Sequence, residues 1–179
     1  MEQDIFDVRG LHIAITGGAS GIGLAAAREL AGRGALLDIW DIKPESLAAA
    51  LEGPLQPFRE QVTTRQVAKE MGGLDIVASA PDLFLAKPIE QTSDMELARV
   101  MQVNFASQFF IVRTAAQEFR RDHRPGRIVL VTSVPREQSM LDTAAYAAAH
   151  GAVYNLVRAA GHELAREGIT VNAISLGWM

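Results

Sequence analysis

A glycine-rich segment near the N-terminus has the residue types and spacing of a phosphate-binding loop. It reads Thr16-Gly-Gly-Ala-Ser-Gly-Ile-Gly23 and lies between an apolar stretch, 11–15, and a helix-like stretch, 24–30. Glycines let the backbone turn tightly and approach a ligand closely, and the N-terminus of a following helix offers unpaired N–H groups and a positive dipole end to a phosphate group. A nucleotide is therefore the first ligand that the sequence suggests.

A carboxylate further along the chain strengthens this interpretation. A second apolar stretch, 35–40, leads into Asp41, which lies 18 positions after Gly23. Strand, glycine-rich loop, helix, strand and acid follow one another in this order in dinucleotide-binding domains, where the acid accepts hydrogen bonds from the adenosine ribose. Glycines between a strand and a helix can also be simple structural punctuation, but the complete layout favours cofactor binding.

The elements that position these residues alternate along the whole chain. We expect strands near 11–15, 35–41, 55–58, 74–78, 127–132 and 169–174, and helices near 24–33, 44–52, 62–71, 93–122 and 143–166. Ser93-x-x-Glu96 forms a capping box that begins the fourth of these helices. The alternation predicts an α/β fold with a doubly wound parallel sheet, helices on both faces and six strands, in one domain over 1–179.

Composition and charge narrow the function classes. The chain has 179 residues, a net charge of −4 and no cysteine. The negative charge gives no electrostatic reason to bind nucleic acid or anionic lipid, and the lack of cysteine excludes disulfides, thiol catalysis and cysteine metal sites. His12, His123 and His162 share no ligand-like spacing, so we expect no metal site. The acidic N-terminus and the lack of a membrane-length apolar run lead us to expect a soluble cytoplasmic protein.

With these motifs in place, the sequence resembles the short-chain dehydrogenase/reductase family over nearly its whole length. Thr16 to Gly23 fits the cofactor loop TGxxxGxG of that family. Asn104, Ser133 and Tyr146 fit three of its four catalytic positions, and the 13 positions from Ser133 to Tyr146 equal the separation in the family. Several motifs that agree in order and spacing make the resemblance specific.

The resemblance implies a site for each part of an oxidoreductase reaction. It assigns cofactor binding to Thr16, Gly17, Ser20, Gly21, Ile22, Gly23, Asp41, Ser79 and Ala80. It makes Tyr146 the acid or base that exchanges a proton with an alcohol or ketone, Ser133 the hydrogen-bond partner of the same oxygen, and Asn104 the holder of a water that relays protons. Asp41 would repel the 2′-phosphate of NADP, so the expected cofactor is NAD(H).

The fourth catalytic position departs from the family. The family has a lysine one helical turn after the tyrosine, and its charge favours the phenolate; this chain has His150 there. A histidine is mostly neutral at pH 7, so it would orient Tyr146 more than it lowers the pKa of the phenol. We therefore predict that His150 is a weakened substitute for the lysine; the alternative is a hydrogen-bonded helix histidine without proton chemistry.

Further departures gather in the part that would contact the substrate. The family has Asn-Asn-Ala-Gly where this chain has Ser79-Ala-Pro-Asp82, which puts a proline and a carboxylate close to the expected cofactor. Gln61 replaces an acid near the adenine, and Leu176-Gly177 replaces Pro-Gly. The given sequence ends at Met179, before the segment that forms the substrate lid and a seventh strand in the family. We expect 134–142 to border the substrate.

Three functions remain open at this stage. The first is an NAD(H)-dependent oxidoreductase acting on an alcohol or ketone, the second a non-redox lyase or isomerase on the same fold, and the third a nucleotide-binding partner subunit with impaired redox activity. The alanine-rich helix expected over 143–166 has almost no polar face over its first turns. A helix of this kind is normally buried on more than one side. We expect a homodimer or homotetramer through the long helices; the alternative is that another part of this chain covers the second side.

Overall fold

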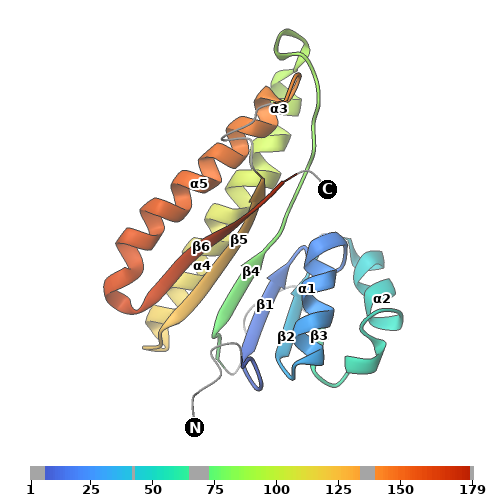
Figure 1. The fold of residues 1–179 in the computed structure, drawn as a ribbon, viewed down its shortest axis with the longest axis vertical. Helices are drawn as coiled ribbons and strands as arrows, with labels where there is room; N and C mark the ends of the chain where they lie inside the picture. The colour runs from blue at the N-terminus through green and yellow to red at the C-terminus, as the bar shows by residue number, and fades with distance from the viewer. Residues whose placement is uncertain (1–6, 42, 65–72, 134–139, 178–179) are drawn as a thin grey trace. The chain divides into compact units, whose positions relative to one another are not determined.

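The computed structural model of the chain describes residues 7–41, 43–64, 73–133 and 140–177. Contacts divide the chain into two compact units, 1–80 and 81–179. The prediction of a single domain over 1–179 stays a prediction. Figure 1 labels the elements of both units. Among the described residues, no helix combines the length and apolar character needed to cross a membrane.

The described residues of the first unit form four parallel strands and two α-helices. Its strands are β1 (His12–Thr16), β2 (Leu36–Trp40), β3 (Val62–Thr64) and β4 (Ile76–Ser79), in the order β3-β2-β1-β4. Helix α1 (Gly21–Gly32) connects β1 to β2, and α2 (Pro44–Glu52) follows β2 with its proline in the first turn. A parallel pair of strands needs such a helical crossover, so this order begins a doubly wound sheet.

The core of this unit holds β1 firmly against α1. Ile13 and Ile15 of β1 are buried, together with Ala27 and Ala31 of α1. The two alanines let the helix axis lie close to the sheet, and the β-branched isoleucines suit a strand that is covered by its neighbours. The connection between β1 and α1, which contains the glycine-rich loop, is therefore fixed at both ends.

The structure corrects the prediction for 55–64. Gln56–Phe58, predicted as a strand, is a single turn of 3-10 helix, closed by the Phe58 N–H donating to the Leu55 carbonyl at 2.9 Å. The third strand is instead Val62–Thr64, predicted as the start of a helix, and Val62 pairs with Leu37 of β2. Three consecutive β-branched residues suit a strand better than a helix. The rest of that predicted helix, 65–71, lies outside the described residues.

The second unit pairs two long parallel strands with three helices. The strands are β5 (Gly126–Ser133) and β6 (Ile169–Leu176), and the helices are α3 (Asp94–Met101), α4 (Ser107–Arg121) and α5 (Ala144–Leu164). Single 3-10 turns lie at Ile89–Gln91 and Ala165–Glu167. Helix α5 packs against β5 and β6, α4 packs against β5, and the two helices contact each other (Figure 1).

The long helix predicted over 93–122 begins as expected but is interrupted. Its capping box is present: the Ser93 hydroxyl accepts from the Glu96 N–H at 3.3 Å, and the Ser93 N–H donates to the Glu96 carboxylate at 2.9 Å. Between α3 and α4 the backbone widens into a π-helical turn at Gln102–Ala106. Such turns are frequent at functional sites, and this one contains Asn104, which is fully buried.

Candidate active site

The glycine-rich loop adopts a conformation that needs its glycines. Gly17 has φ +70 and Gly21 has φ +49, in the left-handed region that side chains disfavour. A Cβ on Gly23 would collide with the carbonyl oxygen of Gly17, and a Cβ on Gly18 would come too close to the Ile39 side chain. The loop therefore brings bare backbone to the place where α1 begins.

Hydrogen bonds anchor this loop to the ends of the neighbouring strands. The N–H groups of Gly17 and Gly18 donate to the Trp40 carbonyl at 2.8 and 3.2 Å. The Thr16 hydroxyl donates to the Ser79 hydroxyl at 2.9 Å, and the Ala80 N–H donates to the Thr16 carbonyl at 3.1 Å. The predicted cofactor residues on β1 and β4 thus meet at the carboxyl edge of the sheet.

Asp41 lies beside the same loop. Its Oδ2 accepts from the Ala19 N–H and its Oδ1 from the Lys43 N–H, both at 3.3 Å. These contacts fix the carboxylate where β2 ends, next to the loop that follows β1. This is the position that the sequence predicts for an acid that binds a ribose.

The donors around this loop fit a diphosphate. Ser20 stands at the N-cap of α1 with an extended backbone, and its side chain makes no capping hydrogen bond. Gly21 and Ile22 are exposed, and the first-turn N–H groups of a helix have no acceptor within the helix. A dinucleotide fits these groups: the glycine backbone and the first-turn N–H groups suit its diphosphate, and the nearby carboxylate suits its ribose.

In the second unit, two predicted catalytic rings lie one turn apart on α5. The ring centroids of Tyr146 and His150 are 4.3 Å apart, and His150 is only 3% exposed. Phe84 packs edge-on against Tyr146 with a centroid distance of 5.2 Å. The spacing of four residues therefore places both rings on one helix face, as expected.

The hydrogen bonds of His150 define its tautomer. Its Nδ1 accepts from the Ser133 backbone N–H at 3.3 Å and lies 2.9 Å from the Thr132 hydroxyl. A backbone N–H can only donate, so Nδ1 carries a lone pair and the proton of the neutral ring is on Nε2. His150 is thereby held against the end of β5 with Nε2 turned away from that strand.

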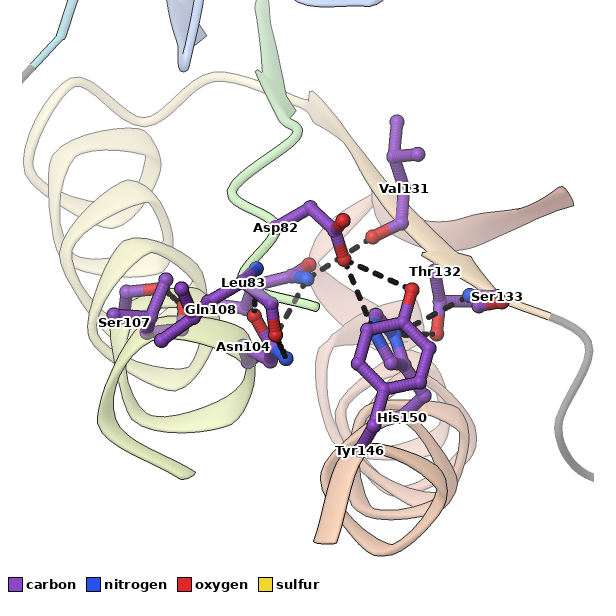
Figure 2. Close-up of polar contacts among 11 residues, drawn as sticks. Asp82, Leu83, Asn104, Ser107, Gln108, Val131, Thr132, Ser133, Tyr146 and His150 are labelled. Carbon is purple, nitrogen blue, oxygen red and sulfur yellow. Dashed lines mark hydrogen bonds and ion pairs between the residues drawn. The ribbon is translucent and has the colours of Figure 1, made fainter. Parts of the chain in front are cut away.

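Asp82 connects the two rings. Its Oδ1 accepts from the Tyr146 phenol at 3.0 Å and lies 3.3 Å from His150 Nε2. The second contact is within ion-pair distance but lacks hydrogen-bond geometry, and Nε2 makes no hydrogen bond to any of the described residues. Figure 2 shows Asp82 joined to both residues of α5.

These neighbours set the ionisation of the phenol. Burial, together with the negative charge of Asp82, raises the pKa of Tyr146 to about 12, against the opposing effect of a hydrogen bond with Ser133. Contact with His150, and then with Tyr146, lowers the pKa of Asp82 although burial acts the other way. At neutral pH the pair is therefore a protonated phenol donating to an ionised carboxylate.

Asn104 holds the segment that follows Asp82. Its Oδ1 accepts from the Leu83 N–H at 2.7 Å, and its Nδ2 donates to the Leu83 carbonyl at 3.0 Å. Gln108, one turn later, donates to the Val131 carbonyl of β5 at 3.0 Å. Figure 2 shows these side chains reaching from α4 and the π-helical turn to the two strand-end segments. The water relay predicted for Asn104 stays a prediction.

The second unit thus brings together Ser133, Tyr146, His150 and Asn104, and adds two residues that the sequence did not assign. From the sequence, Asp82 is only a carboxylate that lies close to the expected cofactor. Thr132 received no role, although it is a buried polar residue that continues the alternation of the buried Ile128 and Leu130 in β5. The sequence signal for Thr132 is a hydroxyl at a strand position where the alternation of β5 predicts an apolar residue. Of the predicted loop 134–142, residues 134–139 lie outside the described residues.

Comparison with known proteins identifies the family of this chain. Residues 11–179 match the family described as short chain dehydrogenase. L-2,3-butanediol dehydrogenase of Corynebacterium glutamicum is 28% identical over 91% of this chain and 69% of its own length. The 5-keto-D-gluconate 5-reductase of Escherichia coli K12 is 29% identical over 98% of this chain and 74% of its own length.

Solved structures give the same result. NAD+-bound xylitol dehydrogenase superposes with a TM-score of 0.88 at 26% identity, over 96% of this chain and 72% of that one. A short chain dehydrogenase from Mycobacterium smegmatis gives a TM-score of 0.90 at 25% identity, over 96% and 78%. These similarities confirm the predicted doubly wound α/β fold and the predicted enzyme class. The chain belongs to the short-chain dehydrogenase family and is an oxidoreductase of that family.

Proposed function

We propose that this protein is an NAD(H)-dependent oxidoreductase that interconverts a small alcohol and the corresponding carbonyl compound. The observation that carries the proposal is the grouping of Tyr146 and Ser133 around His150: the phenol is protonated, its ring packs on His150, and Ser133 holds His150 through its backbone N–H and acts on the pKa of the phenol through its side chain. A hydroxyl pair of this kind can hold one substrate oxygen and give it a proton.

The cofactor would be held by the loop of the first unit. The amides that begin α1 and the backbone of Gly17 suit the diphosphate, and the Asp41 carboxylate suits the ribose hydroxyls. The same carboxylate would repel a 2′-phosphate, which favours NAD(H) over NADP(H). The bound nicotinamide supplies or accepts the hydride.

The remaining chemistry belongs to side chains of the second unit. In the reducing direction, Ser133 and Tyr146 donate hydrogen bonds to the carbonyl oxygen, and Tyr146 gives its proton as negative charge develops there. In the oxidising direction Tyr146 must first lose its proton, and its pKa of about 12 makes the phenolate scarce at neutral pH. We therefore expect oxidation of the alcohol to accelerate with rising pH.

The names of the relatives suggest the size and polarity of the substrate. They are named for a butanediol, a ketogluconate and xylitol, all of them small and rich in oxygen. We propose a substrate of the same kind, a short hydroxylated alcohol or ketone.

One observation favours a second candidate. The Tyr146 proton is already engaged with Asp82, so the phenol is satisfied without a substrate. A chain that binds nucleotide but transfers hydride poorly, as a partner subunit, would tolerate this arrangement.

Turnover measurements separate these candidates. The purified protein is mixed with NADH and a panel of small ketones, and the absorbance of the reduced nicotinamide is followed. We expect turnover, and we expect Tyr146→Phe to lower kcat/KM by roughly 100-fold or more while NADH binding is kept. Tight NADH binding without turnover over the whole panel would support the partner subunit instead.

Assembly and location belong to the same proposal. Phe109 and Phe110 of α4 are 42% and 50% exposed, which would suit burial against a second copy of this helix pair in a homodimer or homotetramer. Light scattering during size exclusion measures this directly. A cytoplasmic location is proposed on the lack of cysteine alone.

A further inference from the structure

The phenol of Tyr146 has one proton and two acceptors that need it. In the structure this proton lies between Tyr146 and Oδ1 of Asp82, 3.0 Å apart. The proposed reaction needs the same proton on the substrate oxygen. Because a hydroxyl donates only once, a bound substrate must take the phenol away from Asp82.

The groups on either side of Asp82 are held in place when this happens. The next residue, Leu83, is held at both its N–H and its carbonyl by the buried Asn104. His150 approaches the same oxygen from the other side, and its ring is fixed by the Ser133 N–H. When the substrate takes the phenol, the ionised carboxylate exchanges a hydrogen bond to Tyr146 for contact with water. A substrate that brings a donor of its own to this carboxylate therefore binds more favourably than one that does not.

We propose that the substrate itself supplies this donor, through a second hydroxyl on the carbon next to the reacting one. Asp82 is then a specificity-determining residue that selects vicinal diols and α-hydroxy ketones over simple alcohols and ketones. The inference rests on the proposed oxidoreductase function and names the substrate class of the same site.

The geometry supports adjacent hydroxyls. The phenol oxygen and Oδ1 are in hydrogen-bond contact, so an oxygen beside Tyr146 and an oxygen beside Asp82 are also close to each other. Two oxygens on neighbouring carbons of one molecule meet this condition. The Asp82 side chain is 55% exposed, which leaves it open to a ligand. A neutral hydroxyl replaces the neutral phenol as donor, and a hydrogen bond to a charged acceptor is among the stronger kinds.

The test observes Tyr146 directly, without turnover. The chain has two tyrosines, so protein labelled with 13C at the tyrosine ζ carbon gives two resonances, and Tyr146→Phe assigns them. The NAD+-loaded protein is titrated with butane-2,3-diol, butane-1,3-diol and butan-2-ol. We expect the Tyr146 signal to report at least about tenfold tighter binding of the 2,3-diol than of either other alcohol.

Variants assign this preference to Asp82. Asp82→Ala is expected to abolish it, and Asp82→Asn, which keeps an uncharged acceptor and the shape of the side chain, to retain only part of it. Asp122→Asn removes the same charge from a partly exposed carboxylate paired with Arg121 and is expected to keep the full preference. If Asp82→Ala fails to fold, Asp82→Asn carries the comparison.

Each outcome has a separate meaning. Equal affinity for the three alcohols in the wild type, or an unchanged preference in both Asp82 variants, would overturn the inference. Tighter binding of 1-aminopropan-2-ol than of propane-1,2-diol would overturn the choice of a hydroxyl in favour of a cation. Turnover of simple ketones without a diol preference leaves the proposed function intact, whereas a diol preference without turnover of any substrate contradicts the proposed function alone.

Discussion

At Tyr146 the surrounding residues stabilise the neutral phenol rather than the phenolate. Burial and the Asp82 carboxylate raise its pKa to about 12. His150 directs its Nδ1 to the Ser133 N–H, and its Nε2 lies 3.3 Å from Asp82 rather than on the phenol oxygen. In this structure His150 is bonded to the end of β5 and lies against Asp82, whereas the family has a positively charged lysine at this position.

Restoring that charge is expected to change the pH dependence. In His150→Lys an ammonium group lies near Asp82 and Tyr146, so the pKa of the phenol falls from about 12. Because oxidation of an alcohol needs the phenolate, its rate in the wild type rises with pH up to that pKa, and in the variant the rise comes at lower pH. The measurement is the pH profile of kcat/KM for oxidation, with the 13Cζ signal of Tyr146 as a second readout.

His150→Gln is the matched control, since it is neutral and can still accept from the Ser133 N–H. It is expected to leave the alkaline rise where it is in the wild type. Identical profiles for His150→Lys and His150→Gln would mean that the residue at 150 does not control the ionisation of Tyr146.

Not every residue of this site could be predicted from the sequence. Ser133, Tyr146 and His150 follow from spacing along one strand and one helix turn. The contact of Asp82 with Tyr146 spans 64 positions, and its direction depends on how the segment after β4 is bent. That bend is set by Asn104, whose partner is a backbone amide and leaves no mark in the sequence.

Among the elements of the second unit, the π-helical turn positions Asp82 through Asn104. It turns Asn104 inward, where both polar atoms of the amide hold Leu83. The sequence predicted one continuous helix over 93–122, because hydrophobic periodicity does not register a single widened turn. The other boundaries of the helices are close to the predicted ones, since proline, glycine and the capping box mark them locally.

Removing the Asn104 side chain is expected to destabilise the second unit. Asn104→Ala leaves the N–H and the carbonyl of Leu83 without their partners and should lower the free energy of unfolding by about 2 kcal/mol. Urea denaturation followed by circular dichroism measures this. Asn155→Ala is the control, because its amide bonds to the Gly151 carbonyl within exposed α5 surface and should cost far less. A loss no larger than that of the control would contradict the role given to Asn104.

The glycine loop allows an equally local test. In Gly23→Ala the new methyl group meets the backbone of Gly17, so the loop must shift and the affinity for NADH is expected to fall by about tenfold or more. Gly32→Ala, at the other end of α1, meets only the Phe58 ring at 3.7 Å, an ordinary contact, and should keep the affinity. Isothermal titration with NADH compares the two variants, and equal affinities would show that the close approach at Gly23 is unimportant for binding.

For the whole molecule, the predicted fold class was right because many weak signals agree. The same doubly wound sheet is indicated by the alternation of strands and helices, by the acid at the end of one strand and by the glycine-rich loop. The family match over residues 11–179 agrees with this fold class. The third strand was misplaced because a short edge strand of three residues carries little periodicity. A fold class can therefore be predicted correctly although one strand is misplaced, whereas a single catalytic contact cannot.

The preference for one cofactor can be measured as a difference in the free energy of unfolding of the whole chain. A ligand that binds the folded state alone stabilises it by about 2.7 kcal/mol when its concentration is a hundred times its Kd. Asp41 is fixed beside the loop by the Ala19 and Lys43 amides, so it would meet the ribose of NADH favourably and a 2′-phosphate unfavourably. We expect NADH to raise the free energy of unfolding, measured in urea, clearly more than NADPH at the same concentration.

Asp41→Asn tests whether this difference comes from charge. Asparagine can still accept from the Ala19 N–H and a ribose hydroxyl, but it no longer repels a phosphate, so the gap between NADH and NADPH should narrow mainly through stronger stabilisation by NADPH. Asp75→Asn is no suitable comparison because that carboxylate accepts from the His12 backbone, whereas Glu45→Gln, exposed in the first turn of α2, removes one charge without touching the loop. If NADPH stabilises the wild type as much as NADH does, Asp41 does not select the cofactor, and the discrimination inferred from its position after β2 is wrong.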